Sequence, residues 1–353
     1  FYRDRRHGEF WVGRYLSLNE IKTVYQIIAR NIKEVEDSLL AKKETLVHRG
    51  EDATLDASYA PHEKDGDLTI ALSELRLIKD DYEIDEMRRA VDATVRGFAD
   101  VIKSLPEAMN HPRGERVIDG TFYIRARVEG NELGYNTIAA AGAHACVLPW
   151  IRNDGPALSG DLLLLDAGVE VESHYTADIT RTIPINGKFT KAQREIYEIV
   201  LAAQQAGIDA VKPGAKYRDI NNACMKVLAK GLEKLGVLTV SAEESLNPEV
   251  GIHRRWSVHA SGHMLGIDVH DCAHARKEQY ADAELQPGMI LTVEPGFYIQ
   301  PDDTLFPPEY RGIGVRIEDD VLVTETGCKI LSNALPRHPD EVEAYMAQIL
   351  SSK

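Results

Sequence analysis

The clearest pattern in the chain is a helical repeat of apolar residues that begins just after Asp80. Apolar side chains recur there every three or four positions, at Ile84, Met87, Val91, Val95, Phe98 and Ile102. This spacing predicts a long amphipathic helix, and either Asp80 or Asp81 can cap its first turn. We therefore expect a helix that packs against the rest of the molecule through one face.

Further helices are predicted in the second half of the chain. The sequence T-K-A-Q at Thr190 is typical of a capping box, and Pro213 with Gly214 stops the helix that follows. Two more helices are expected, one over about 219–235 and a short one near Asp340.

Two pairs of apolar runs alternate with these helices. The first pair lies in DLLLLDAGVEVESHYTADITRT, residues 161–182, on either side of a polar segment at Glu172 and Ser173. If these runs form an antiparallel hairpin centred there, positions whose numbers sum to 344 face each other, and Asp166 lies opposite Asp178. The second pair, 289–298 and 313–324, is expected to form another hairpin around a proline-containing loop. Helices that alternate with antiparallel strand pairs, in two halves, predict an α+β fold with the helices on one face of a curved sheet.

The first 77 residues have a different pattern. They contain a strand-like stretch at 10–15, a helix-like stretch at 18–40 and a polar, irregular stretch at 42–68. This segment has too little apolar material for an independent core. The main core is therefore expected in the remainder of the chain.

Composition and charge narrow the classes of function. The 353 residues are 44% hydrophobic and 27% charged, which is enough apolar material for a substantial core and long enough for two domains. A formal net charge of -15 argues against a nucleic-acid partner, because no basic face is evident to attract phosphate. No apolar run approaches 18 residues, so no membrane-spanning helix is expected. The four cysteines form no CxxC pair and no signal peptide is evident, which favours a cytoplasmic location.

The acidic residues within the apolar runs are the strongest candidates for chemistry. Asp166 and Asp178 would bring two anions to one site, which favours either a protonated carboxylic acid or a bound cation. The second pair of runs contains Glu294 and Glu318. The segment HASGHMLGIDVHD adds three imidazoles, those of His259, His263 and His270. The four carboxylates, together with one of these imidazoles, form an oxygen-rich set of ligands. Such a set suits two divalent ions, with Mn, Co and Zn all plausible.

Each of these residues alone has a simpler explanation. An isolated aspartate in a strand is usually an edge or turn residue, and an isolated histidine usually belongs to the surface or the core. Chance is a poor explanation for the ordered set D-x11-D, H-x3-H-x6-H, E and E. No GxGxxG, GxxxxGK[ST] or GxSxG motif indicates dinucleotide binding, a phosphate loop or a serine nucleophile.

The order and sequence context of this set resemble those of the pita-bread metallopeptidases. The segments LDAG, TADITRT, GHMLGIDVHD, TVEPGFY and GVRIEDD are most similar to Xaa-Pro aminopeptidase (aminopeptidase P) and its relative prolidase. The resemblance runs from about Leu75 to the C-terminus. It implies a pita-bread catalytic domain over 78–353 and identifies 1–77 as the remnant of an N-terminal creatinase-like domain.

The resemblance also implies a role for each candidate. Asp178 and Glu318 correspond to ligands that bridge two metal ions, and Asp166 to a ligand that chelates one of them. His263 and Glu294 correspond to ligands of the other ion, and Glu294 is also the group expected to take a proton from the attacking water. His259 and His270 correspond to groups that face the substrate. Arg316 corresponds to a group that orients Asp166 or another ligand carboxylate.

One position departs from the family pattern. The relatives carry a histidine 17 residues before the first metal-binding aspartate, whereas this chain has Pro149 between Leu148 and Trp150. No gap in the surrounding sequence moves His144 into that place. Proline has no side-chain donor, acceptor or titratable group, so we expect weakened hydrolysis.

The resemblance implies a metal-dependent peptidase that releases an N-terminal residue preceding proline. Its cofactors would be two divalent ions, with Mn favoured, and its substrate a peptide with proline in the second position. The family usually forms homodimers or homotetramers. Two alternatives stay open: a prolidase that cleaves only Xaa-Pro dipeptides, and a metal-bearing homologue that binds peptides with little turnover.

Overall fold

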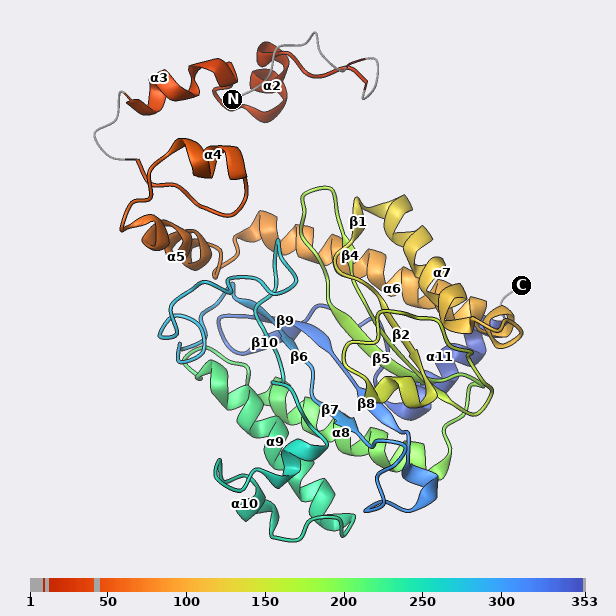
Figure 1. Ribbon diagram of the computed structural model, residues 1–353. Helices are drawn as coiled ribbons and strands as arrows, with labels where there is room; N and C mark the ends of the chain where they lie inside the picture. The colour runs from red at the N-terminus through yellow and green to blue at the C-terminus, as the bar shows by residue number, and fades with distance from the viewer. Residues whose placement is uncertain (1–8, 10–12, 41–44, 352–353) are drawn as a thin grey trace. The chain divides into compact units, whose positions relative to one another are not determined.

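The computed structural model describes residue 9 and residues 13–40 and 45–351. The chain divides into two compact units, Phe1–Thr69 and Ile70–Lys353. All the strands that the structure describes belong to the second unit, as Figure 1 shows. Within the described residues, no helix is long and apolar enough to cross a membrane.

The first unit consists of short helices held together by polar contacts. Its elements are α2 (Leu18–Tyr25), the 3₁₀ helix η1 (Ile32–Glu34), α3 (Val35–Leu40), α4 (Ala53–Ser58) and the start of α5 (Asp65–Leu75). Among the side chains described in this unit, no hydrophobic one is buried. The Asp65 carboxylate instead accepts hydrogen bonds from Arg49 Nε at 2.6 Å and from the backbone N–H of Val47 at 2.9 Å.

Two sequence expectations for the first unit are wrong. The helix expected over 18–40 is divided, because Gln26 adopts a left-handed conformation (φ 53°) that ends α2. The stretch 42–68, expected to be irregular, contains α4 and the start of α5. The strand expected at 10–15 lies partly outside the described residues, and its described part, 13–15, is not in a strand.

The helices predicted in the second unit are all present. α6 (Asp81–Met109) begins with a capping box in which Asp80 and Glu83 each accept a hydrogen bond from the other's backbone N–H. α8 (Lys191–Ala210) begins in the same way with Thr190 and Gln193. The remaining two predicted helices are α9 (Tyr217–Lys234) and α11 (Pro339–Ser351).

A further long helix, α7 (Gly114–Glu129), was missed by the sequence analysis. Its buried residues Ile118, Phe122 and Ala126 are four positions apart, which is a helical signal. Phe122 packs edge-on against Phe98 of α6, with ring centroids 6.2 Å apart. The two helices therefore form a pair beside the first group of strands (Figure 1).

The first group of strands has the order β2-β3-β5 and is antiparallel throughout. Its strands are β2 (Ile138–Ala141), β3 (Leu162–Ala167) and β5 (Ile179–Pro184), and a smaller pair joins β1 (Glu132–Leu133) to β4 (Val169–Glu170). Asp166 pairs with Thr180, so the expected pairing of Asp166 with Asp178 is wrong. The hairpin turns about Ser173, as the bridge between Glu170 and Thr176 shows. Because side chains alternate with a period of two, this two-residue shift leaves both aspartates on one face.

The second predicted hairpin is confirmed and is interrupted at its centre. β6 (Ile290–Val293) pairs with β9 (Asp319–Val323), and β7 (Gly296–Tyr298) pairs with β8 (Gly314–Arg316). β9 also pairs with β10 (Cys328–Ile330) on its other side. Shorter elements complete the unit: η2 (Gly142–Cys146), α10 (Ala242–Ser245), η3 (Ile252–Arg255) and η4 (Pro308–Tyr310).

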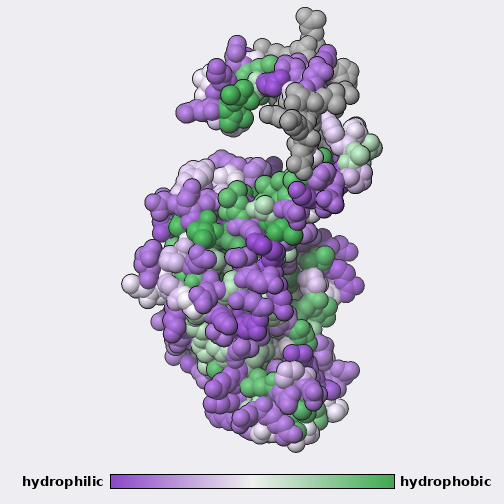
Figure 2. Space-filling model, turned by 90° about the vertical axis from the view of Figure 1, so that its left-hand side faces the viewer, coloured by the Kyte–Doolittle hydropathy of each residue, from purple (hydrophilic) through white to green (hydrophobic). Residues whose placement is uncertain are grey.

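Each group of strands has its own helical layer. α6, α7 and α11 share a buried core with β3 and β5, whereas α8 and α9 share one with β7 and β8. The halves are joined by hydrogen bonds, including one from the Glu318 backbone N–H to the Thr180 carbonyl at 3.0 Å. The arrangement is the α+β fold predicted from the sequence. Figure 2 shows a face on which hydrophilic residues predominate, consistent with the large net charge.

Candidate metal centre

Four of the five predicted metal ligands come from strands and strand ends of both halves, and the fifth comes from a loop. Asp166 lies in β3, and Asp178 immediately precedes β5. Glu294 lies between β6 and β7, and Glu318 lies between β8 and β9. His263 belongs to a loop that is tied to β6, because the Thr292 backbone N–H donates to the His263 carbonyl at 2.8 Å. The meeting of the two hairpins therefore brings together residues up to 152 positions apart (166 to 318).

Three of these residues converge closely enough to hold one ion. Asp178, His263 and Glu318 each offer a ligand atom, and these atoms lie within 4.8 Å of one another. His263 Nε2 is 3.2 Å from Asp178 Oδ2 and 3.6 Å from Glu294 Oε1. Its Nδ1 lies 3.1 Å from the Met264 carbonyl oxygen, a contact that places the ring proton on Nδ1 and leaves Nε2 free for a metal.

Electrostatics favour a cation among these carboxylates. Burial raises the pKa of Glu294 to about 7 and raises the pKa of Asp166 and Glu318 above their usual range. The negative charge of Asp178 adds to each of these shifts. Glu318 Oε1 is buried and has no hydrogen-bond partner among the described residues. Divalent cations satisfy such an oxygen and remove the repulsion, so the residues present fit a metal centre.

Tyr135 was not identified from the sequence, although it contacts two of the ligands. Its hydroxyl lies 2.6 Å from Asp166 Oδ1 and 2.5 Å from Asp178 Oδ1. Burial and these two negative charges raise the pKa of Tyr135 well above its usual value, so the phenol keeps its proton and donates it. A lone tyrosine in the stretch before β2 carries no sequence signal for this role.

Thr180 is a second residue that the sequence analysis missed. Its hydroxyl donates to Glu318 Oε2 at 2.6 Å and accepts from Arg316 Nε at 3.2 Å. The TADITRT segment contains it, but its importance depends on the pairing of β5 with the other hairpin. Thr180 therefore connects the two halves within the site.

Arg316 contacts the ligand that the sequence assigned to it. Its Nη2 donates to Asp166 Oδ2, and its Nη1 donates to the Tyr298 hydroxyl at 3.0 Å. The side chain is buried, with an exposed fraction of 4%. An arginine that makes contacts through three nitrogens in a buried site has a fixed orientation, and it fixes Asp166 in turn.

The two histidines expected to face the substrate lie beside the ligands. His259 Nε2 is 2.7 Å from the Tyr298 hydroxyl, and Nδ1 is 3.7 Å from Glu294 Oε2. Burial lowers the pKa of His259 to about 4, with a further contribution from Arg316, so its imidazole is neutral near pH 7. The His270 ring packs edge-on against the His263 ring, with centroids 4.4 Å apart.

Pro149 is exposed on the loop that leads from η2 to β3. His144 is not available to replace the missing imidazole, because its Nδ1 lies 2.7 Å from Glu115 Oε1. Its ring also stacks on Trp150 with centroids 3.8 Å apart. These contacts hold the His144 side chain of η2 against Glu115 of α7 and Trp150 of the loop.

Comparison with known proteins identifies the family. Residues 85–325 match the model of metallopeptidase family M24. The chain is 55% identical over 346 residues to Xaa-Pro aminopeptidase 1 of Streptomyces coelicolor, covering 97% of this chain and 70% of that protein. It is 38% identical over 274 residues to the Xaa-Pro aminopeptidase of Escherichia coli, covering 77% of this chain and 60% of that protein.

Solved structures agree with this assignment. The aminopeptidase PepP of Pseudomonas aeruginosa superposes with a TM-score of 0.86 at 33% identity, covering 99% of this chain and 82% of that one. Aminopeptidase P from Escherichia coli with the inhibitor Pro-Leu gives 0.86 at 34% identity, with coverage of 98% and 81%. The chain belongs to metallopeptidase family M24, and its second unit has the pita-bread fold that the sequence resemblance implied.

Proposed function

We propose that this protein is a metal-dependent aminopeptidase that removes an N-terminal residue preceding proline. The observation that carries the proposal is the convergence of Asp178, His263 and Glu318, with Asp166 and Glu294 beside them, in a fold shared with aminopeptidase P. Two Streptomyces coelicolor relatives, named Xaa-Pro aminopeptidase 1 and 2, carry the same activity in their names.

The five carboxylate and imidazole ligands would hold two divalent ions, and Mn is the ion we favour for an oxygen-rich set. Such a pair of ions lowers the pKa of a bound water and polarises the carbonyl of the scissile bond. We assign Asp178 and Glu318 as the residues that would bridge the ions, and the convergence of their ligand atoms with that of His263 supports this assignment. Asp166 is assigned to one ion, and His263 with Glu294 to the other.

The chain's own residues would then handle protons and orientation. Glu294 is assigned to accept the proton of the attacking water, because a carboxylate that contacts both an ion and its bound water is well positioned to act as the base. The neutral His259, next to Glu294, is assigned to hydrogen-bond the substrate, and His270 is assigned the same kind of contact on the His263 side. Arg316 fixes Asp166 and so acts without touching substrate.

Pro149 supports a modified form of the proposal. Loss of an imidazole that provides acid–base help typically costs about 10² to 10⁴ in rate. We therefore assign this chain a lower turnover than relatives that carry histidine there. A protein that binds metals and Xaa-Pro peptides with almost no turnover is the second candidate function, and Pro149 is the observation that favours it.

The remaining assignments are part of the same proposal. Residues 1–77 would be the last part of an N-terminal domain, and 78–353 the catalytic domain. The active form would be a cytoplasmic homodimer or homotetramer.

The test is hydrolysis by protein loaded with Mn, Co or Zn, using Xaa-Pro dipeptides and longer Xaa-Pro-Xaa peptides. The aminopeptidase proposal requires cleavage of the longer peptides before proline. Cleavage confined to dipeptides would make the protein a prolidase. Asp178→Asn should abolish activity, whereas Asp302→Asn, on an exposed loop, is the matched control. Tight binding of both peptide classes without cleavage would support the second candidate.

A further inference from the structure

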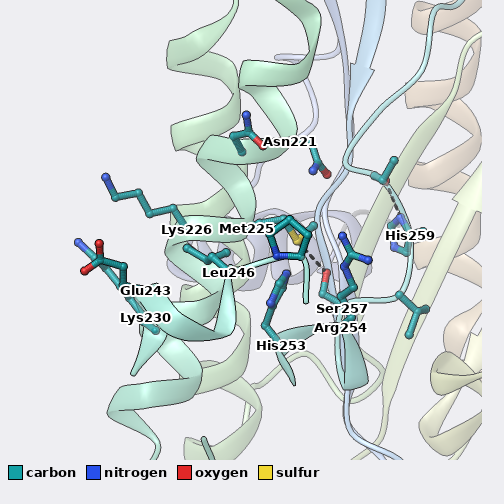
Figure 3. Close-up of a pocket in the computed structure, with 15 residues that line it drawn as sticks. Asn221, Met225, Lys226, Lys230, Glu243, Leu246, His253, Arg254, Ser257 and His259 are labelled. Atoms are coloured by element: carbon teal, nitrogen blue, oxygen red, sulfur yellow. Dashed lines mark hydrogen bonds between the residues drawn. The ribbon is translucent and has the colours of Figure 1, made fainter. Parts of the chain in front are cut away.

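A groove of about 940 Å³ lies beside α9. Figure 3 shows it between α9, which carries Lys226 and Lys230, and the segment that carries His253, Arg254 and His259. Leu246 and the exposed Val258 give it some apolar surface, and Glu243 of α10 also lines it. We call this site the α9 groove.

The α9 groove begins at the edge of the metal centre. His259 lines the groove and also lies next to Glu294 and Tyr298. The Tyr298 hydroxyl accepts from Arg316, which in turn holds the ligand Asp166. The groove and the metal centre therefore share His259, so a peptide that binds in the groove would lie beside the candidate site.

The charge of the α9 groove is opposite to that of the protein. The chain has a net charge of -15, yet the groove is lined by three cations, Lys226, Lys230 and Arg254, and one acid, Glu243. All three cations are exposed, and none forms an ion pair with a side chain that the structure describes. A local cluster of unpaired positive charge on an acidic protein attracts anionic groups and gives specificity for them.

The volume of the groove indicates which part of a peptide it can hold. An aminopeptidase has a single residue on the amino side of the bond that it cleaves. The α9 groove falls in the size range of pockets that bind drug-sized ligands, which is more space than that one residue needs. It therefore suits the part of the peptide on the carboxyl side of the cleaved bond.

We infer that the α9 groove is a binding site for the leaving peptide and selects peptides with carboxylates downstream of proline. The inference rests on the proposed aminopeptidase function. Lys226, Lys230 and Arg254 bind either acidic side chains or the terminal carboxylate of a short peptide. Each exposed ion pair of this kind changes affinity by about two- to fivefold, so three together give about tenfold or more.

The test measures binding of leaving peptides directly, by titration calorimetry on metal-loaded full-length protein. The probes are Pro-Glu-Glu, Pro-Gln-Gln and the C-terminally amidated form of each. We expect Pro-Glu-Glu to bind at least tenfold more tightly than amidated Pro-Gln-Gln, with the difference reduced at high salt. The four peptides separate the effect of acidic side chains from that of the terminal carboxylate.

The decisive variant combines Lys226→Gln, Lys230→Gln and Arg254→Gln. It should remove the preference for Pro-Glu-Glu while leaving the affinity for amidated Pro-Gln-Gln within about twofold. Lys234→Gln is the matched control, because Lys234 is an exposed lysine of the same helix that does not line the groove. Equal losses in the triple and control variants, or a wild-type protein that binds all four peptides equally, would overturn the inference.

Hydrolysis of Ala-Pro-Glu-Glu and Ala-Pro-Gln-Gln separates this inference from the function beneath it. Cleavage of both substrates at equal kcat/KM would support the aminopeptidase function and contradict the inferred selectivity of the α9 groove. If Pro-Glu-Glu binds preferentially but neither substrate is cleaved, the aminopeptidase function is wrong and the α9 groove remains a peptide-binding site. If the triple variant and the wild type unfold at the same temperature, loss of fold is excluded as the cause of weaker binding.

Discussion

Glu294 lies directly across the second hairpin from Glu318. One ladder ends with Val293 paired to Asp319, the other begins with Gly296 paired to Arg316, and both keep the same register. The two glutamates occupy the break between these ladders. Two buried carboxylates in that position repel each other unless a proton or a cation lies between them. This relationship underlies the first prediction.

The protein should bind two divalent ions per chain and lose thermal stability when they are removed. Ions that bind the folded state at about 100 times their Kd contribute about 2.7 kcal/mol each. Metal analysis after gel filtration, and thermal unfolding with and without chelator, are the measurements. The His263→Ala variant should lose one of the two ions and keep the other, because the bridging carboxylates remain. A metal content near zero after addition of Mn, Co and Zn would contradict the proposed centre.

Arg316→Lys should weaken metal binding although the positive charge is kept. A lysine cannot reproduce the contacts of the guanidinium with Asp166, Thr180 and Tyr298 at once. Loss of a side chain that orients a metal ligand typically costs about 10- to 100-fold in affinity or activity. Competition with a chromogenic chelator measures the affinity. The exposed Arg88 provides the control substitution Arg88→Lys, and equal affinity in both variants would remove Arg316 from this role.

Tyr135→Phe should also reduce metal affinity, by about tenfold. The substitution removes the hydroxyl that donates to Asp166 and Asp178 and leaves the aromatic ring in place. Tyr310→Phe is the matched control, because Tyr310 donates to a carboxylate, that of Glu195, which is not a ligand. The same chelator competition applies. A control variant that loses as much affinity as Tyr135→Phe would indicate a general effect on the fold.

Pro149→His should raise turnover of Xaa-Pro peptides by about 10² or more without changing metal content. The new imidazole would restore the donor and acceptor that proline lacks. Val147→His places a histidine on an exposed position two residues away and serves as the control. Steady-state kcat is the quantity to compare. High turnover of the unmodified chain, with no gain in the variant, would show that an imidazole at this position is dispensable.

Stability should fall in acid as Asp303 takes up a proton. Burial acts to raise the pKa of Asp303, but hydrogen bonds from Arg255 and Trp256 outweigh it and leave the pKa below its usual range. A carboxyl with a lowered folded-state pKa contributes stability above its unfolded pKa of about 3.9, and this contribution is lost as pH falls through the folded value.

Asp303→Asn should therefore be less stable than the wild type near neutral pH and should show a smaller loss of stability below about pH 4. Tryptophan fluorescence reports the change, since Trp256 is buried and donates to Asp303 at 2.7 Å. The exposed Asp302 supplies the control variant Asp302→Asn. Parallel acid-unfolding curves for wild type and Asp303→Asn would contradict the prediction.

The sequence by itself determined four of the helices, α6, α8, α9 and α11, and the identity of the chemical groups. The capping boxes at Asp80 and Thr190 are local, because each depends on residues three positions apart, and both are present. The ordered acidic and histidine motifs are likewise local, and they were sufficient to indicate the family. The helix α7 was missed although its four-residue spacing was available in the sequence.

Only the tertiary structure decided how the two hairpins meet. The register of β3 and β5 depends on the turn around Ser173, and the sequence pattern placed that turn one position too early. The roles of Tyr135 and Thr180 depend on contacts with residues far away in the chain, which no local pattern encodes. The α9 groove likewise requires a helix, a loop and the metal centre to lie side by side. Contacts within a few residues can be predicted from local pattern, whereas contacts between distant segments depend on the packing of the whole chain.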